Sequence, residues 1–145
     1  MRLGKSSDSS GCTNVYEISN EIESVFPFLE EKYAHVDVEV FVVFRCFPGP
    51  HRRKATRRYV KSERVLYIDL HFDEEILKHA SGDEQRAAIS CGFLTYLSGS
   101  LSNYEFSELH VEKFMSDLRE ACEGIGWRTD CPPESVLPDA RGRGR

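Results

Sequence analysis

The strongest hydrophobic pattern in the chain is a strict alternation of apolar positions between residues 36 and 47. The apolar residues at every second position are Val36, Val38, Val40, Val42 and Phe44. This period of two predicts a β-strand with one buried face. The opposite face starts polar and becomes apolar at Phe41 and Val43, so we expect the second half of the strand to be covered on both sides.

A second alternating run, residues 65–72, predicts another strand, and the short stretch 56–61 predicts a third strand between the two. The apolar face of the run contains Leu66, Ile68, Leu70 and Phe72. Because strands joined by short connections are antiparallel neighbours, we expect a three- to four-stranded antiparallel sheet.

Apolar residues at helical spacing mark the stretches on either side of the predicted strands. Residues 14–34 have this spacing, although Pro27 interrupts it and either kinks one helix or begins a second. Ser81 and Glu84 form a capping box, which predicts the start of a long helix that runs to about residue 103.

The last helix is expected to begin at Ser107, and the elements together predict an α+β domain. In this fold an N-terminal helix precedes the antiparallel sheet, and the C-terminal helices pack on one face of that sheet. Residues 1–13 are polar and are expected to form a disordered arm. Residues 14–127 are expected to form the single domain, and residues 128–145 an extended tail.

Charged residues are strongly segregated along the chain, although the net charge is only −5. Residues 51–64 contain seven basic residues and one acidic residue, whereas residues 69–139 contain fifteen acidic and five basic residues. Such asymmetry bears on partners and association rates rather than on the fold. The acidic part is expected to repel nucleic acid and to attract a basic protein.

The acidic helical half supplies the first candidate surface, one that binds a basic protein partner. Its candidate partner-binding residues are Glu105, Glu108, Glu112, Asp73, Glu74 and Glu75. The first three follow roughly the spacing of one helix face. Ordinary solubilising charge is the alternative explanation for these residues.

The basic segment supplies the second candidate surface, a small RNA- or DNA-binding module. Its candidate residues are Arg52, Arg53, Lys54, Arg57 and Arg58. Arginine density and a nearby Tyr59 for base stacking are typical of nucleic-acid binding. The alternative is an exposed hairpin whose basic residues pair with the acidic residues of the same chain.

The chain contains no motif of a known catalytic site. It has no P-loop, no dinucleotide-binding glycine motif and no nucleophile elbow, so we expect neither an enzyme nor a cofactor. Asp69, His71 and Asp73 alternate as metal ligands sometimes do. Because no other His or Cys recurs at ligand spacing, we interpret them as solvent-facing and capping residues and expect no metal.

The five cysteines are odd in number and include no C-x-x-C pair, so we expect neither a disulfide framework nor a zinc ribbon. Cys46, Cys91 and Cys122 lie in apolar patterns and are expected to be small buried side chains. The first residues lack the apolar stretch of a secretion signal, and no apolar run reaches the ~18 residues of a membrane helix. We therefore expect a cytoplasmic protein that does not contact a membrane.

Several short strings between residues 67 and 127 resemble those of one group of proteins. The strings are Tyr67-Ile68-Asp69-Leu70, Gln85-Arg86, Tyr104-Glu105-Phe106, and the set Phe114, Asp117, Leu118, Gly126 and Trp127. Over residues 15–127 the chain resembles immunity proteins of bacterial contact-dependent growth inhibition and related polymorphic toxin systems. The resemblance implies a cytoplasmic, non-catalytic protein that binds a cognate toxin domain, often a nuclease, and blocks it. The segment 51–64 and the Arg-Gly end are not part of the resemblance.

Overall fold

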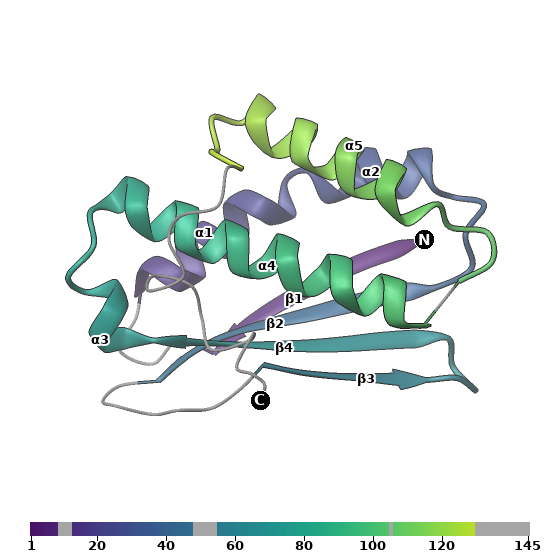
Figure 1. Ribbon diagram of the computed structural model, residues 1–145, viewed down its shortest axis with the longest axis horizontal. Coiled ribbons are helices and arrows are strands. Elements are labelled where there is room, and N and C mark those ends of the chain that lie inside the picture. The colour runs from purple at the N-terminus through teal and green to yellow at the C-terminus, as the bar shows by residue number, and fades with distance from the viewer. Residues whose placement is uncertain (9–12, 48–54, 105, 130–145) are drawn as a thin grey trace.

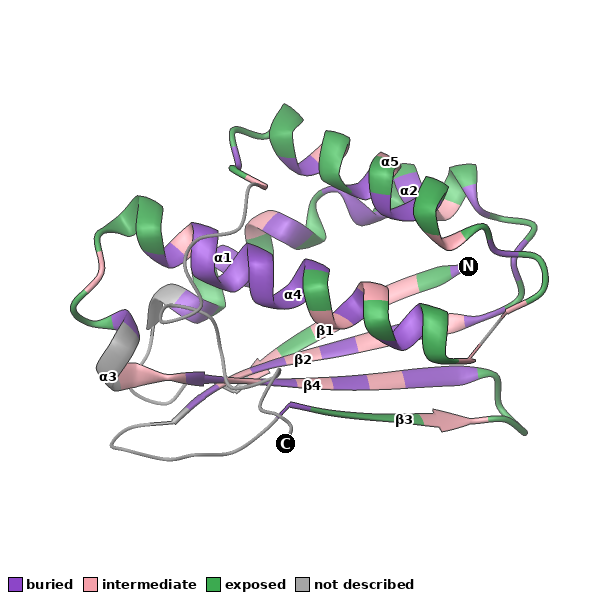
Figure 2. Cartoon of the chain, viewed as in Figure 1, coloured by how far each residue is buried: buried purple, intermediate pink, exposed green. Residues whose placement is uncertain are grey.

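A four-stranded sheet carries the helices α1, α2, α4 and α5 on one of its faces (Figure 1). The computed structural model describes residues 1–8, 13–47, 55–104 and 106–129. Buried residues gather between the sheet and this helical layer (Figure 2). The α+β class predicted from the sequence is therefore confirmed.

The sheet is mixed, with both parallel and antiparallel strand pairs. Its strands are β1 (Arg2–Asp8), β2 (Glu39–Phe47), β3 (Thr56–Val60) and β4 (Val65–Asp73). Their order across the sheet is β1-β2-β4-β3. The β1–β2 and β2–β4 pairs are parallel, whereas β3 and β4 are antiparallel.

The prediction of an antiparallel sheet is wrong for the β1–β2 and β2–β4 pairs. The short turn at residues 61–64 does join β3 and β4 as antiparallel neighbours. However, β3 exposes Thr56, Arg57 and Arg58, and such a polar strand is suited to a sheet edge. The inward-facing side chains of β4 are all apolar and buried, so β4 takes the central place beside β2.

Residues 2–8 form the edge strand β1, where the sequence predicted a disordered arm. Hydrophobic alternation missed this strand because its side chains are mostly polar and its backbone ladder to β2 supplies the pairing. Two contacts hold it at the helical layer. The Met1 ammonium donates to the Tyr33 carbonyl oxygen at 2.7 Å, and the Leu3 N–H donates to Glu30 Oε2 at 2.8 Å.

The helical elements largely match the predicted ranges. They are α1 (Thr13–Glu23), α2 (Phe26–Lys32), α3 (Glu74–Leu77), α4 (Gly82–Tyr104) and α5 (Val111–Gly124). Pro27 lies in the first turn of α2, so it belongs to the start of a second helix. The capping box is confirmed, because the Glu84 N–H donates to Ser81 Oγ at 3.2 Å and the Ser81 N–H donates to Glu84 Oε1 at 2.7 Å.

The last helix begins at Val111 and not at Ser107. The preceding residues form a turn in which the Leu109 N–H donates to the Phe106 carbonyl oxygen at 3.0 Å, and the Leu109 side chain is buried. His110 is the N-cap of α5, because its Nδ1 accepts a hydrogen bond from the backbone of the first turn at 3.2 Å. In the described part of the chain, no helix combines the length and the apolar character that crossing a membrane requires.

The core confirms the predicted inward faces of the two long strands. Phe41 and Val43 are only half-buried, so the expected cover on both sides of β2 is wrong; the helices lie on the other face. Cys46, Cys91 and Cys122 are buried, and the last two are not disulfide-bonded. Cys46 is disulfide-bonded, which the number and spacing of the cysteines did not predict.

Candidate protein-binding surfaces

The predicted acidic residues form two groups that lie at opposite ends of α4. Asp73 and Glu74 lie where β4 passes into α3, shortly before α4 begins. Glu108 lies in the turn after α4, and Glu112 lies in the first turn of α5. A helix of 23 residues is about 34 Å long, so roughly this distance separates the two groups (Figure 1).

The distance between the two groups of acidic residues is close to the diameter of a standard protein interface. One side of a standard protein interface covers about 800 Å², which corresponds to a disc about 32 Å across. A disc centred on Glu108 therefore reaches only to about the middle of α4. An interface of this size that is centred on Glu108 excludes Asp73 and Glu74, and which of the predicted acidic residues a partner contacts stays a prediction. Glu105 lies outside the described residues, and so does the side chain of Glu75.

The outer face of α5 carries charges of both signs. Glu112, Glu120 and Glu123 are exposed, but Lys113 and Arg119 are exposed among them. The outer face of α5 therefore presents both acidic and basic side chains, with more acidic than basic ones.

The two described arginines of the predicted nucleic-acid surface, Arg57 and Arg58, lie on opposite faces of the edge strand β3. Successive side chains of a strand alternate between its faces. The Arg57 guanidinium lies over the ring of Tyr96 on α4, 5.6 Å from its centroid. The Arg58 guanidinium lies over the ring of Tyr67 on β4, 4.9 Å from its centroid. The alternation thus separates these two cations. Arg52, Arg53 and Lys54 lie outside the described residues.

The alternating Asp and His residues on β4 form an ion-pair cluster on the sheet face opposite the helices. Asp69 Oδ1 accepts a hydrogen bond from Arg45 Nε at 2.6 Å and lies 3.2 Å from His71 Nε2. Within the described ranges, no group of three or more His, Cys, Asp or Glu side chains is arranged to hold a metal ion. Asp69 is engaged with its neighbours in the sheet.

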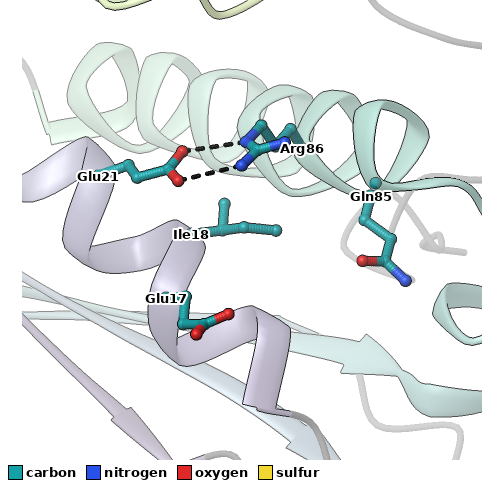
Figure 3. Close-up of a pocket in the computed structure, with 6 residues that line it drawn as sticks. Glu17, Ile18, Glu21, Gln85 and Arg86 are labelled. Carbon is teal, nitrogen blue, oxygen red and sulfur yellow. Dashed lines mark hydrogen bonds and ion pairs between the residues drawn. The ribbon is translucent and has the colours of Figure 1, made fainter.

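A hollow of about 380 Å³ lies between α1 and the start of α4, lined in part by Glu17, Ile18 and Gln85. Figure 3 shows Glu21 and Arg86 pointing toward one another across it. Their two hydrogen bonds measure 3.1 Å and 3.2 Å, and the bond from Arg86 is the main cause of the lowered pKa of Glu21.

A third group joins this ion pair from the C-terminal end of the described chain. The indole Nε1 of the buried Trp127 donates to Glu21 Oε1 at 3.0 Å. The carboxylate of Glu21 therefore links α1 to α4 through Arg86 and to the end of the described chain through Trp127. We interpret this hollow as structural.

A second hollow, of about 330 Å³, lies at the opposite end of α4. Three aromatic side chains line it: Tyr59 of β3, Tyr104 at the end of α4, and Phe106 in the turn that follows. The Tyr59 ring centroid lies 5.4 Å from that of Tyr104 and 5.2 Å from that of Phe106. All three side chains are half-buried, so each keeps a surface that a partner can contact.

Charged residues of both signs surround these rings. Lys61 and Arg64 belong to the turn between β3 and β4, Asp37 precedes β2, and Glu108 follows α4. Arg64 Nε lies 3.7 Å from Asp37 Oδ2, and both side chains are exposed. Glu108 is exposed and makes no ion pair with any described residue, so it is available to a cation on a partner.

The sequence predicted one residue of this second hollow as a partner contact, Glu108, and placed Tyr59 in a nucleic-acid surface. It did not predict that Tyr104 and Phe106 belong to a surface site. The sequence signal that could have indicated them is the pair of aromatic residues, Tyr104 and Phe106, at the end of the predicted long helix. Their contact with Tyr59 depends on the position of β3 at the sheet edge, which only the fold reveals.

Comparison with known protein families identifies a relationship over most of the chain. The family model described as Immunity protein 44 matches residues 1–124. No match was found among the curated proteins or among the solved structures.

Proposed function

Because the chain belongs to the Immunity protein 44 family, which implies a cognate toxin as partner, we propose that it binds a toxin domain tightly and covers its active site. The observation that carries this proposal is the family match, which extends over residues 1–124 and so includes every strand and helix in the described part of the chain. Inhibition by steric occlusion of the active site requires no catalytic group in the immunity protein. It requires only that the complex dissociates more slowly than the toxin would act on its substrate.

The proposed target is a nuclease, as part of a system for contact-dependent growth inhibition. Fifteen acidic residues against five basic ones between residues 69 and 139 support this target. A nuclease cleft is basic because it binds phosphates. An acidic partner approaches such a cleft faster than a neutral one, by electrostatic steering that salt weakens.

Co-expression tests the proposal. The chain is expressed with and without the toxin domain encoded beside its gene, and both cell survival and co-purification are measured. We expect survival only when both proteins are present, and a complex that stays intact during size-exclusion chromatography. If no complex purifies and the toxin still kills, the proposal is wrong.

A nucleic-acid-binding module that uses Arg52, Arg53, Lys54, Arg57 and Arg58 is the alternative function. A salt titration with duplex DNA separates it from the first. A nucleic-acid binder loses affinity with a slope of about 0.9 per phosphate contact on a double-logarithmic plot. Absence of binding at low salt would remove this alternative.

A further inference from the structure

The seam between the edge strand β3 and helix α4 concentrates residue types that carry binding energy in protein interfaces. Tyrosine and arginine are enriched among interface residues whose truncation weakens binding most. Here Arg57 lies over Tyr96 along the strand, and Tyr59, Tyr104 and Phe106 line the hollow at its end. Each aromatic side chain is half-buried, so its conformation is already restricted before a partner arrives.

The turn beside this hollow contains the one described residue other than glycine with a positive φ. Arg64 has a φ of 56°, in the left-handed region that costs an ordinary side chain about 1–2 kcal/mol. The conformation is held by its own backbone, because the Glu39 N–H donates to the Arg64 carbonyl oxygen at 2.9 Å. Strained residues of this kind concentrate at functional sites, and this one borders the aromatic hollow.

The charges around the hollow define the chemistry of its occupant. Arg64 is opposed by Asp37, whereas Lys61 and Glu108 have no ion pair among the described residues. A partner that places a Lys or Arg beside Glu108 and an apolar side chain among the three rings satisfies both parts of the site. Charges of both signs beside three rings fit a protein surface, which supplies cationic, anionic and apolar side chains, better than a nucleic acid, whose backbone supplies only negative charge.

We propose that the cognate toxin docks on this seam, inserting an apolar side chain among Tyr59, Tyr104 and Phe106 with a basic side chain against Glu108. The inference rests on the proposed function and specifies where the toxin binds. It places the centre of the interface at the C-terminal end of α4, and it leaves Asp73 and Glu74 outside an interface of standard size.

The test measures the dissociation constant between the purified chain and its cognate toxin domain for two variants of the seam. Tyr104→Ala removes one ring of the hollow, and we expect it to weaken binding at least 30-fold, as for a central interface residue. Glu108→Lys reverses the exposed charge, and we expect at least a 10-fold loss. Ser107→Trp, which fills the hollow from an exposed lining residue without removing a contact, is expected to have a similar effect.

Two matched controls lie elsewhere on the molecule. Tyr16→Ala removes an exposed ring from α1, which packs on β1 at the opposite edge of the sheet. Glu120→Lys reverses an exposed charge far along α5. Both are expected to change the dissociation constant less than threefold. Urea unfolding of every variant establishes that a loss of binding occurs in a folded protein.

The outcomes separate this inference from the proposed function. If the wild-type chain binds no toxin, both are wrong. If the wild-type chain binds and the folded seam variants bind equally well, only the docking surface is wrong, and Glu74→Lys then tests the other end of α4. If a 20-nucleotide single-stranded RNA binds at physiological salt and Tyr104→Ala abolishes that binding, the seam is a nucleic-acid surface and the inference fails.

Discussion

Asp117 on α5 receives polar contacts from two helices and carries a strongly lowered pKa. The Tyr33 hydroxyl donates to its Oδ2 at 2.6 Å, Lys113 Nζ lies 3.2 Å from the same oxygen, and Lys32 Nζ lies 3.2 Å from Oδ1. The hydrogen bond from Tyr33 is the main cause that lowers the pKa of Asp117 to about 2. Burial and the same bond raise the pKa of Tyr33.

Asp117→Asn is expected to lower the free energy of unfolding by about 1–2 kcal/mol at pH 7. Because the folded pKa of Asp117 is depressed, its contribution is present above its unfolded pKa near 4 and disappears as the pH falls toward 2. The difference between variant and wild type should therefore shrink over this range. Urea unfolding at pH 7, 4 and 2.5 measures it, with the exposed Glu120→Gln as the control that changes stability by less than about 0.5 kcal/mol.

Arg64→Gly tests whether the positive φ at residue 64 lowers the stability of the folded chain. Glycine adopts a φ of 56° without strain, so Arg64→Gly is expected to leave the free energy of unfolding unchanged or to raise it by up to about 1 kcal/mol. The same change removes a cation beside the aromatic hollow, so it reduces the repulsion of the toxin's basic side chain and is not expected to weaken toxin binding. Glu63→Gly, one residue earlier, is the control: it should lower stability by about 0.5–1 kcal/mol. Equal stability losses in the two variants would contradict the strain at Arg64.

At the scale of elements, β1 is the strand that the hydrophobic pattern could not predict. Its residues Leu3, Lys5 and Ser7 point to the helical layer, as the contact of Lys5 Nζ with Ser19 Oγ at 3.2 Å indicates. Only the first of these is apolar. A polar edge strand is specified by the partner that it pairs with, and β2 presents an apolar strand that needs a neighbour on each side.

Gly4→Val tests whether β1 is an integral strand. A Cβ at Gly4 would lie 3.0 Å from the Phe41 ring, so the larger side chain must displace that ring. We expect a loss of about 1–2 kcal/mol in the free energy of unfolding, in the range of overpacking changes. Ser6→Val, at an exposed position of the same strand, is the control and should be close to neutral. A disordered arm would give no loss for either variant.

At the scale of the whole molecule, Trp127 packs against the helical layer although it lies beyond the residues that the family model matches. The family match ends at residue 124, yet Trp127 is 4% exposed and hydrogen-bonds to Glu21 of α1. Gly126, with a φ of 87°, turns the chain after α5 so that the indole returns to the core.

A chain that ends at residue 124 is therefore expected to be about 3–5 kcal/mol less stable than one that ends at residue 129, the cost of losing a buried tryptophan. Trp127→Phe in the longer chain should recover part of this difference, because it keeps the ring but loses the hydrogen bond to Glu21. Thermal and urea unfolding of the three proteins provide the comparison. Equal stability of the two lengths would mean that Trp127 contributes nothing to the fold.

Local signals in the sequence determined most elements of this protein. The period-two runs of β2 and β4, the capping box at Ser81 and the excess of acid are each properties of neighbouring residues, and the structure retains all of them. The resemblance to immunity proteins also came from the sequence, and the family match confirms it. Each of these features can be read without knowing which strand lies beside which.

Strand order, strand direction and the surface sites were decided only by the tertiary structure. The position of β4 between β2 and β3 makes the β2–β4 pair parallel and brings Tyr59 of the edge strand to the end of α4. Arg57 and Arg58 lie over rings on opposite faces of that edge strand. The length of α4 separates acidic residues that the sequence grouped together. The physical reason is that pairing between distant strands depends on which arrangement buries the most apolar surface, and no local pattern records that choice.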